Sequence, residues 1–280
     1  MTSNVNPEVD TSAWFIRDED VKELPATALE LLETYAHIPA KDVIPHVLKL
    51  RKEAFALYPW PCIGRLRFLR PSLPSYAAYP AILATLKAES SAALLDVGCC
   101  FGQDLRKLVV DGVNPSQLAG LDLKPEFNEL GKRLFRDADK LHIDFYARDI
   151  FDDGADWEPL WRRFDVIHIT SFLHIWNWDD QLKAAQRLVG FLKPDPGSLF
   201  VGSGIGSTVE GEGPNLEGTG TNCRQSEESF ARLWKEVGDI TGTKWGVKSR
   251  LQRFEPTKPA EGQVWEDQNM GVLTFEVQML

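Results

Sequence analysis

Three acidic residues follow three short apolar segments at intervals that suit a ligand rich in hydrogen-bond donors. Asp96 opens the pattern Asp-x-Gly-x-x-x-Gly, which ends at Gly102, while Asp122 and Asp149 follow the next two apolar segments. An acid about 20 residues after a glycine turn can accept hydrogen bonds from both hydroxyls of a ribose. An acid after the third segment can accept from an exocyclic adenine amine. Taken singly, each acid also suits a helix cap or a turn.

The glycine turn itself favours close approach of a ligand to the backbone. Gly98 and Gly102 lack the Cβ atom that would obstruct such an approach. The spacing is neither the G-x-G-x-x-G of dinucleotide sites nor a P-loop, which needs a Gly-Lys-Ser/Thr ending. A helix that begins near Gln103 would offer free N–H groups to an anion such as a carboxylate. A purely structural turn is the alternative interpretation.

Alternating strand and helix patterns must position these residues. Strands are expected at 93–97, 118–123, 144–147, 165–170 and 199–202, and helices from Gln103 and at 126–137, 179–192 and 226–237. This alternation predicts a parallel sheet with helices on both faces. Strand patterns near Trp245 and at 273–279 predict an antiparallel hairpin at one edge. Ligands bind at the carboxyl ends of strands in such sheets, so the three acids should meet there.

The sequence pattern predicts an N-terminal arm and a helical cap in the first 90 residues, and a ligand-binding domain in residues 91–280. Residues 1–23 lack periodicity, and we expect a loose arm pinned by Trp14 and Phe15. Helices are expected at 25–36, 43–58 and 80–88, the second beginning near Pro45. Residues 202–226 contain many glycines, which predicts either a lid or binding element, or disorder.

Composition excludes several classes of protein. The chain has 280 residues and a net charge of −10, which disfavours nucleic acid as a partner. No segment approaches the roughly 18 apolar residues of a membrane helix, and no secretory signal is evident. The four cysteines and five histidines lack metal-ligand spacing, so we expect no metal and reduced thiols in a cytoplasmic protein.

The acids and glycines together resemble a class I S-adenosylmethionine (SAM)-dependent methyltransferase over residues 90–280. The resemblance implies a Rossmann-like α/β fold with a seven-stranded, mostly parallel sheet whose last strand is antiparallel. It also implies three groups of cofactor-binding residues. These are Asp96, Gly98, Cys99 and Gly102 for the methionine part, Asp122 and Leu123 for the ribose, and Asp149, Ile150 and Phe151 for the adenine.

Three further stretches resemble the methyltransferases of fungal meroterpenoid pathways. They are YPWPCIGRLRFL (58–69), LLDVGCCFGQDLRKL (94–108) and TSFLHIWNWDDQ (170–181). This resemblance spans nearly the whole chain and implies methylation of the carboxyl group of a farnesylated dimethylorsellinic acid intermediate. The expected partner is therefore a hydrophobic small-molecule carboxylic acid. The oligomeric state is left open, a homodimer included.

His174 is the candidate catalytic residue, because it follows the fourth strand beside the expected methyl group. It could orient the acceptor oxygen or act as a base; a packing role is the equal alternative. A carboxylate is already ionised at pH 7 and needs no base, whereas a phenol would. His168, inside the same strand, is expected in the core.

Four residues are candidates for the acceptor site. Trp60 and Trp176 could form walls of an apolar pocket, and Arg65 and Arg67 could receive an anion. Ordinary core packing and a solvated basic face are the respective alternatives. Two alternative functions also stay open, namely methylation of a phenol or an amine, and a non-catalytic scaffold. A nucleic-acid methyltransferase is disfavoured because Ser171-Phe172-Leu173-His174 replaces an Asn/Asp-Pro-Pro-aromatic motif.

Overall fold

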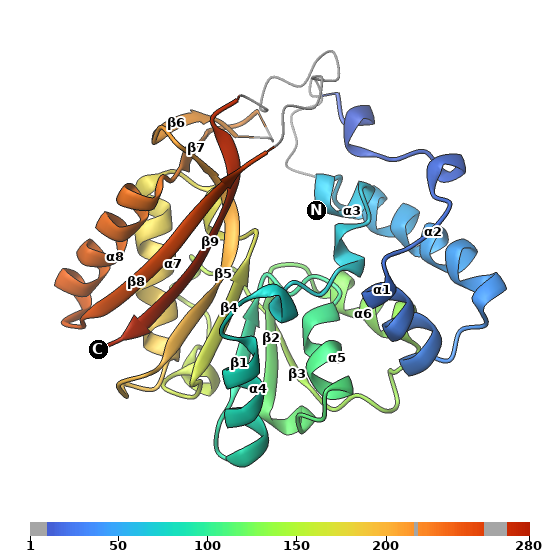
Figure 1. Ribbon diagram of the computed structural model, residues 1–280, viewed down its shortest axis with the longest axis horizontal. Coiled ribbons are helices and arrows are strands. Elements are labelled where there is room, and N and C mark those ends of the chain that lie inside the picture. Colours follow the sequence, from blue (N-terminus) through green and yellow to red (C-terminus); the bar gives the residue numbers. More distant parts are fainter. Residues whose placement is uncertain (1–9, 216–217, 255–267) are drawn as a thin grey trace.

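A seven-stranded sheet with the order β3-β2-β1-β4-β5-β9-β8 forms the centre of the molecule (Figure 1). The computed structural model describes residues 10–215, 218–254 and 268–280. The strands are β1 (Leu94–Val97), β2 (Leu118–Asp122), β3 (Asp144–Ala147), β4 (Val166–Thr170), β5 (Leu199–Ser207), β6 (Gly211–Pro214), β7 (Thr221–Arg224), β8 (Trp245–Arg253) and β9 (Met270–Met279). β1 to β5 run parallel, and β9 is antiparallel to both β5 and β8. The predicted Rossmann-like sheet with an antiparallel last strand is confirmed.

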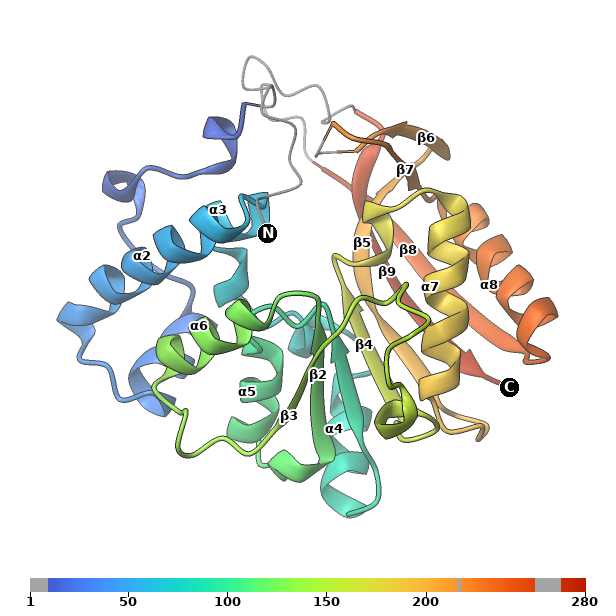
Figure 2. The ribbon, with the colours of Figure 1, turned by 180° about the vertical axis from the view of Figure 1, so that it is seen from behind.

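Helices cover both faces of this sheet. They are α1 (Ala26–Leu29), α2 (Ala40–Leu57), α3 (Pro61–Gly64), α4 (Tyr79–Ala88), α5 (Gln103–Val110), α6 (Pro125–Phe135), α7 (Trp178–Phe191) and α8 (Glu227–Thr241). α7 and α8 pack on one face, seen in front in Figure 2, and α4 and α5 pack on the other. Along β1, Leu95 and Val97 enter the core beneath α7 while Leu94 enters the core beneath α4, as the period of two in a strand requires.

The N-terminal helices share a core with the sheet domain. α2 packs against α6, and a π-helical turn, η3 (Glu30–Tyr35), packs against α5 and α6. Phe101 of the glycine turn belongs to this same apolar cluster. The expected anchoring of the arm is confirmed, because Trp14 is buried and Phe15 lies edge-on to Phe55. The cap therefore rests directly on the turn that follows β1.

Two expectations about local structure need correction. α2 begins at Ala40 rather than near Pro45, so Pro45 lies inside the helix. The helix tolerates the missing N–H of this proline because Val43, Val47 and Leu50 are buried on one face of α2. Within residues 202–226, β5 continues to Ser207, and β6 and β7 then form a separate antiparallel hairpin.

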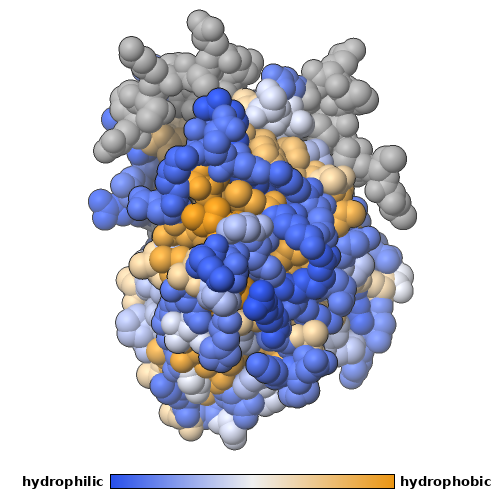
Figure 3. Space-filling model, turned by 90° about the vertical axis from the view of Figure 1, so that its right-hand side faces the viewer, coloured by the Kyte–Doolittle hydropathy of each residue, from blue (hydrophilic) through white to orange (hydrophobic). Residues whose placement is uncertain are grey.

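The side of the molecule at the right of Figure 1 is largely hydrophilic, with apolar side chains gathered in the upper half of the view (Figure 3). Leu57 of α2 and Ile16 of the arm are among the large apolar side chains that remain exposed. Among the described residues, no helix combines the length and the apolar character that crossing a membrane requires.

Candidate functional site

The turn between β1 and α5 has the backbone geometry of a ligand-binding loop. Gly98 and Gly102 have φ values of +69° and +70°, which glycine adopts without steric cost. Cys100 also lies in the left-handed region, at φ 51°. Two further non-glycine residues share this conformation near predicted site residues, namely Leu66, directly before Arg67, and Ser171, three residues before His174. Such backbone strain is concentrated at functional sites.

β1 and β2 bring two predicted acids, Asp96 and Asp122, to this turn. Asp122 accepts hydrogen bonds from the backbone N–H of Cys100 at 2.8 Å and of Lys124 at 3.0 Å. Burial raises the pKa of Asp122 above its ordinary value, and these two N–H donors oppose the shift. Leu123 is 53% exposed beside it. The carboxylate is thus fixed in orientation by the loop.

The third predicted acid follows β3, the strand that neighbours β2. Asp149 follows β3 and accepts a hydrogen bond from the N–H of Phe151 at 3.0 Å, which is also the geometry of a simple turn. Ile150 is buried, and Phe151 lies edge-on to Trp176 with ring centroids 5.0 Å apart. The sheet therefore orders these acids along one edge, as the sequence predicts, and an aromatic contact joins them to the residues after β4.

Phe172 is a site residue that the sequence analysis missed. Its ring lies edge-on to Trp176 at 4.7 Å, and a Cβ atom on Gly98 would come within 3.0 Å of it. The glycine turn and the segment after β4 are therefore in contact. Only its place between Ser171 and His174 pointed to it in the sequence.

Two buried acceptors without partners border the glycine turn. Asp96 Oδ2 and Gln103 Oε1 have no hydrogen-bond partner among the described residues. The α-ammonium group of SAM carries three donors, so it supplies what these oxygens lack. Cys99 is buried, and its thiol lies 3.7 Å from Asn128 Oδ1. The donor and acceptor chemistry of the turn therefore fits the methionine part of SAM.

Asp96 also anchors a buried polar cluster. His168 Nδ1 lies 2.8 Å from Asp96 Oδ1, and His168 Nε2 lies 2.8 Å from Thr170 Oγ1. Asp104 completes the cluster: a carboxylate oxygen of Asp96, a carboxylate oxygen of Asp104 and a ring nitrogen of His168 all lie within 4.8 Å of one another. The core position predicted for His168 is confirmed. The positions of Asp96, Asp104 and His168 in the sequence did not indicate that this histidine lies beside two carboxylates.

This cluster predicts that stability falls as pH rises. Burial raises the pKa of Asp104 from 3.8 to about 6. Burial alone would lower the pKa of His168, but Asp96 and Asp104 outweigh it and raise that pKa above 6.5. Both groups bind protons more tightly in the folded chain, so their contribution to stability is present at low pH. This contribution is lost as pH rises. For Asp104 the loss falls between pH of about 4 and about 6, where the free energy of unfolding decreases by up to about 1.4 kcal/mol per pH unit.

Chemical denaturation of the wild type and Asp104→Asn from pH 4 to pH 8 tests this prediction. The stability of the wild type relative to Asp104→Asn should decrease between pH 4 and pH 6, because the variant cannot release this proton. A difference that increases over this range would contradict the assignment. Asp144→Asn, an exposed acid at the start of β3, is the matched control.

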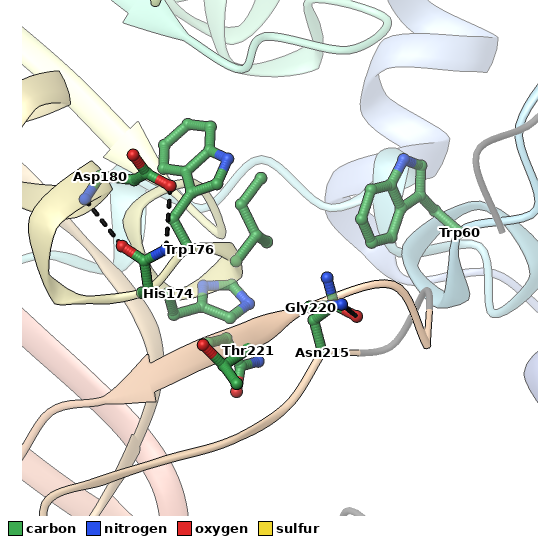
Figure 4. Close-up of a pocket in the computed structure, with 10 residues that line it drawn as sticks. Trp60, His174, Trp176, Asp180, Asn215, Gly220 and Thr221 are labelled. Atoms are coloured by element: carbon green, nitrogen blue, oxygen red, sulfur yellow. Dashed lines mark hydrogen bonds between the residues drawn. The ribbon is translucent and has the colours of Figure 1, made fainter. Parts of the chain in front are cut away.

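The segment after β4 lines a cavity of about 210 Å³ (Figure 4). Trp60 lies on the opposite side of the cavity from His174 and Trp176, and the β6–β7 hairpin closes a third side. Trp60 stacks on Tyr58 with centroids 5.0 Å apart. The structure therefore brings together three predicted site residues from two distant parts of the chain.

His174 faces this cavity in an electropositive surrounding. A Cβ atom on Gly204 of β5 would lie 3.1 Å from His174 Nδ1, so the glycine leaves room for the ring. Burial, assisted by the positive charge of Arg67, lowers the pKa of His174 to about 4. The imidazole is therefore neutral at physiological pH.

The two predicted arginines have different surroundings. Arg67 acts electrostatically on His174, whereas Arg65 donates a hydrogen bond to the carbonyl of Ala13 in the N-terminal arm at 3.2 Å. Neither Arg65 nor Arg67 is among the described residues that line the cavity.

Comparisons with known proteins agree on the type of enzyme. A family model described as the meroterpenoid methyltransferase N-terminal domain matches residues 14–69, and a methyltransferase domain model matches residues 94–195. The O-methyltransferase phiE of a fungal species is 37% identical over 85% of this chain and 79% of its own. The O-methyltransferase atr3 of Stereocaulon alpinum is 38% identical over 89% and 71%.

A third relative and a solved structure complete the comparison. The asnovolin E/chermesin D methyltransferase nvfJ of Aspergillus novofumigatus is 35% identical over 85% of both chains. The 1,6-didemethyltoxoflavin-N1-methyltransferase of Burkholderia thailandensis, solved with S-adenosylhomocysteine, has a TM-score of 0.50 at 19% identity. It covers 86% of this chain and 91% of its own, and it supports the fold.

Proposed function

The chain belongs to the SAM-dependent O-methyltransferases of fungal meroterpenoid biosynthesis, and from this premise we propose that its acceptor is a carboxylate. The acceptor class is a hydrophobic acid of the farnesylated dimethylorsellinic type, and the product is its methyl ester. The observation that carries this proposal is the low pKa of His174 beside Arg67.

A histidine with a pKa of about 4 is a poor base for a phenol. Moving a proton from a phenol of pKa about 10 to such an imidazole is uphill by about 6 pKa units, or about 8 kcal/mol. General bases work best when their pKa lies near the operating pH. A carboxylate has already lost its proton at pH 7, so no base is needed. The environment of His174 therefore favours a carboxylate over a phenol.

The cavity supports an apolar acid as the acceptor. Trp60, Ile175 and Trp176 provide large apolar surfaces, which suit a prenylated hydrocarbon skeleton. The positive charge of Arg67 attracts an anion toward His174, and the neutral imidazole can donate one hydrogen bond to a carboxylate oxygen. Arg67 would thus select the anion, and His174 would orient it.

We propose that the cofactor lies at the glycine turn, which Phe172 of the segment after β4 approaches at Gly98. We assign the methionine part to the turn from Asp96 to Gly102, the ribose to Asp122 and the adenine to Asp149. SAM bound there would supply a methyl group on a sulfonium sulfur: the acceptor carboxylate oxygen would bond to the methyl carbon as the carbon–sulfur bond breaks, which gives the methyl ester and S-adenosylhomocysteine. The residues of this chain align the acceptor oxygen with that carbon and exclude water.

Methyl-labelled SAM tests the acceptor assignment directly. We expect label in a prenylated aryl carboxylic acid, and none in the matched phenol whose acid is blocked as an ester, with products identified by mass spectrometry. Label in the phenol alone would overturn the carboxylate assignment and make His174 a general base. Label in neither would exclude both acceptors of this class. Heat-denatured protein is the control for non-enzymatic methylation.

A further inference from the structure

The two unpaired acceptors at the glycine turn are each tied, through their other polar atom, to the same buried cluster. Asp96 Oδ2 has no partner among the residues that the structure describes, while Asp96 Oδ1 lies 2.8 Å from His168 Nδ1. In the same way Gln103 Oε1 is unpaired within the described part of the chain, while Gln103 Nε2 donates to Asp104 Oδ2 at 3.2 Å. His168 and Asp104 therefore leave one oxygen of each group available to a ligand.

Neither acceptor group can hold its own orientation. The last torsion of an aspartate or glutamine side chain is broad and soft, so the group turns unless a neighbour fixes it. A turned amide at Gln103 would present N–H donors to an ammonium ion, which itself carries donors and no acceptor. The contacts with His168 and Asp104 remove this freedom before a ligand arrives, and such preorganisation raises affinity.

His168 is held in place from two directions. It lies opposite Asp96 in the register of the parallel strands β1 and β4, and both side chains are buried. On the far side of the ring, Nε2 lies 2.8 Å from Thr170 Oγ1 and 3.1 Å from Ser72 Oγ. A hydroxyl group can accept or donate, so these contacts suit both the neutral and the protonated ring. Because an ionised carboxylate can only accept, Nδ1 carries the proton that His168 donates to Asp96.

Asp104 is fixed by the segment between α3 and α4. The backbone N–H of Leu73 donates to Asp104 Oδ1 at 2.7 Å. In the same segment, the hydroxyl group of Tyr76 lies 2.8 Å from Thr170 Oγ1 at the end of β4. The N-terminal part of the chain therefore braces the cluster from the side opposite the glycine turn.

We propose that His168 is a positioning residue for SAM: it holds the Asp96 carboxylate so that Oδ2 receives the α-ammonium group of the cofactor, while Asp104 holds Gln103 Oε1 for the same group. His168 acts through Asp96 rather than on the cofactor itself. This inference rests on the proposed cofactor site at the glycine turn. It does not depend on whether the acceptor is a carboxylate or a phenol.

A pair of ligands tests the inference by isothermal titration calorimetry. One is S-adenosylhomocysteine, and the other is its analogue with hydrogen in place of the α-amino group. The wild type should bind S-adenosylhomocysteine about 10- to 100-fold more tightly, which is the value of a hydrogen bond to a charged group. In His168→Leu this preference should shrink by about 10-fold, because Asp96 is no longer held. The affinity for the analogue should stay within about two-fold of the wild type.

Three outcomes would contradict the inference in different ways. An equal loss of affinity for both ligands in His168→Leu would show that the histidine supports the fold alone. An unchanged preference in His168→Leu, together with weakened binding in Asp122→Ala, would remove His168 from a cofactor site that itself stands. A wild type that binds both ligands equally would overturn the place of the ammonium group, and the inference with it.

Two polar variants locate the effect at Asp96. The amide nitrogen of asparagine lies near the position of the histidine Nδ1, and that of glutamine lies near Nε2. His168→Asn should therefore keep most of the preference for S-adenosylhomocysteine, whereas His168→Gln should lose it, and the reverse order would overturn the proposal. This comparison decides the question should His168→Leu not fold. His142→Leu, which removes an exposed histidine before β3, is the matched control and should keep the wild-type preference.

Discussion

Replacing Asp122 with alanine should weaken the binding of S-adenosylhomocysteine by about 100-fold or more. The reason is that a carboxylate accepting two ribose hydroxyls contributes about 1.5–3 kcal/mol per hydrogen bond, and each 1.4 kcal/mol is a factor of ten in affinity. Asp122 is already oriented for this role by the N–H groups of Cys100 and Lys124. Isothermal titration calorimetry measures the dissociation constant.

Two further variants separate ribose binding from damage to the loop. Asp122→Asn keeps one acceptor oxygen and should lose less affinity than Asp122→Ala. Asp144→Ala removes an exposed acid from the opposite end of the neighbouring strand and should leave the affinity unchanged. Thermal unfolding without ligand shows whether the fold survives each change. An unchanged affinity in Asp122→Ala would remove the proposed ribose site.

Replacing Arg106 with methionine should destabilise the folded protein by about 3–5 kcal/mol, because a buried charge is left without its partner. Arg106 and Asp137 are both buried and form a paired contact, with nitrogen–oxygen distances of 2.7 Å and 2.9 Å. Arg106 also donates to the carbonyls of Phe101 and Gly102 in the glycine turn, at 2.6 Å and 3.1 Å. Urea denaturation measures the loss.

Arg106→Met should also weaken cofactor binding, because the carbonyls of Phe101 and Gly102 in the glycine turn lose the guanidinium group that holds them in place. Arg133→Met is the matched control, because Arg133 pairs with Glu53 at the surface, where an ion pair is worth about 1 kcal/mol or less. The double variant Arg106→Met with Asp137→Leu removes both buried charges and should recover part of the stability. Arg106→Met as stable as the wild type would show that the pair contributes nothing to the fold.

The sequence by itself determined the type of sheet and the place of the cofactor loop. Strand periodicity, the glycines at 98 and 102 and the acids at 122 and 149 are local signals, and parallel strands bring their carboxyl ends to one edge. These signals act within a few residues along the chain. The α/β order and the antiparallel hairpin at the edge of the sheet follow from them.

Tertiary structure decided what each side chain meets. His168 and Asp96 are 72 residues apart and pair only because β1 and β4 are neighbours in register. Arg106 of α5 reaches Asp137 beyond the end of α6, and β7 reaches the cavity only because the glycine-rich segment folds as a hairpin. The physical reason is that burial and the charge of Arg67 lower the pKa of His174, whereas Asp96 and Asp104 raise the pKa of His168. Neither property belongs to a residue type or to its spacing along the chain.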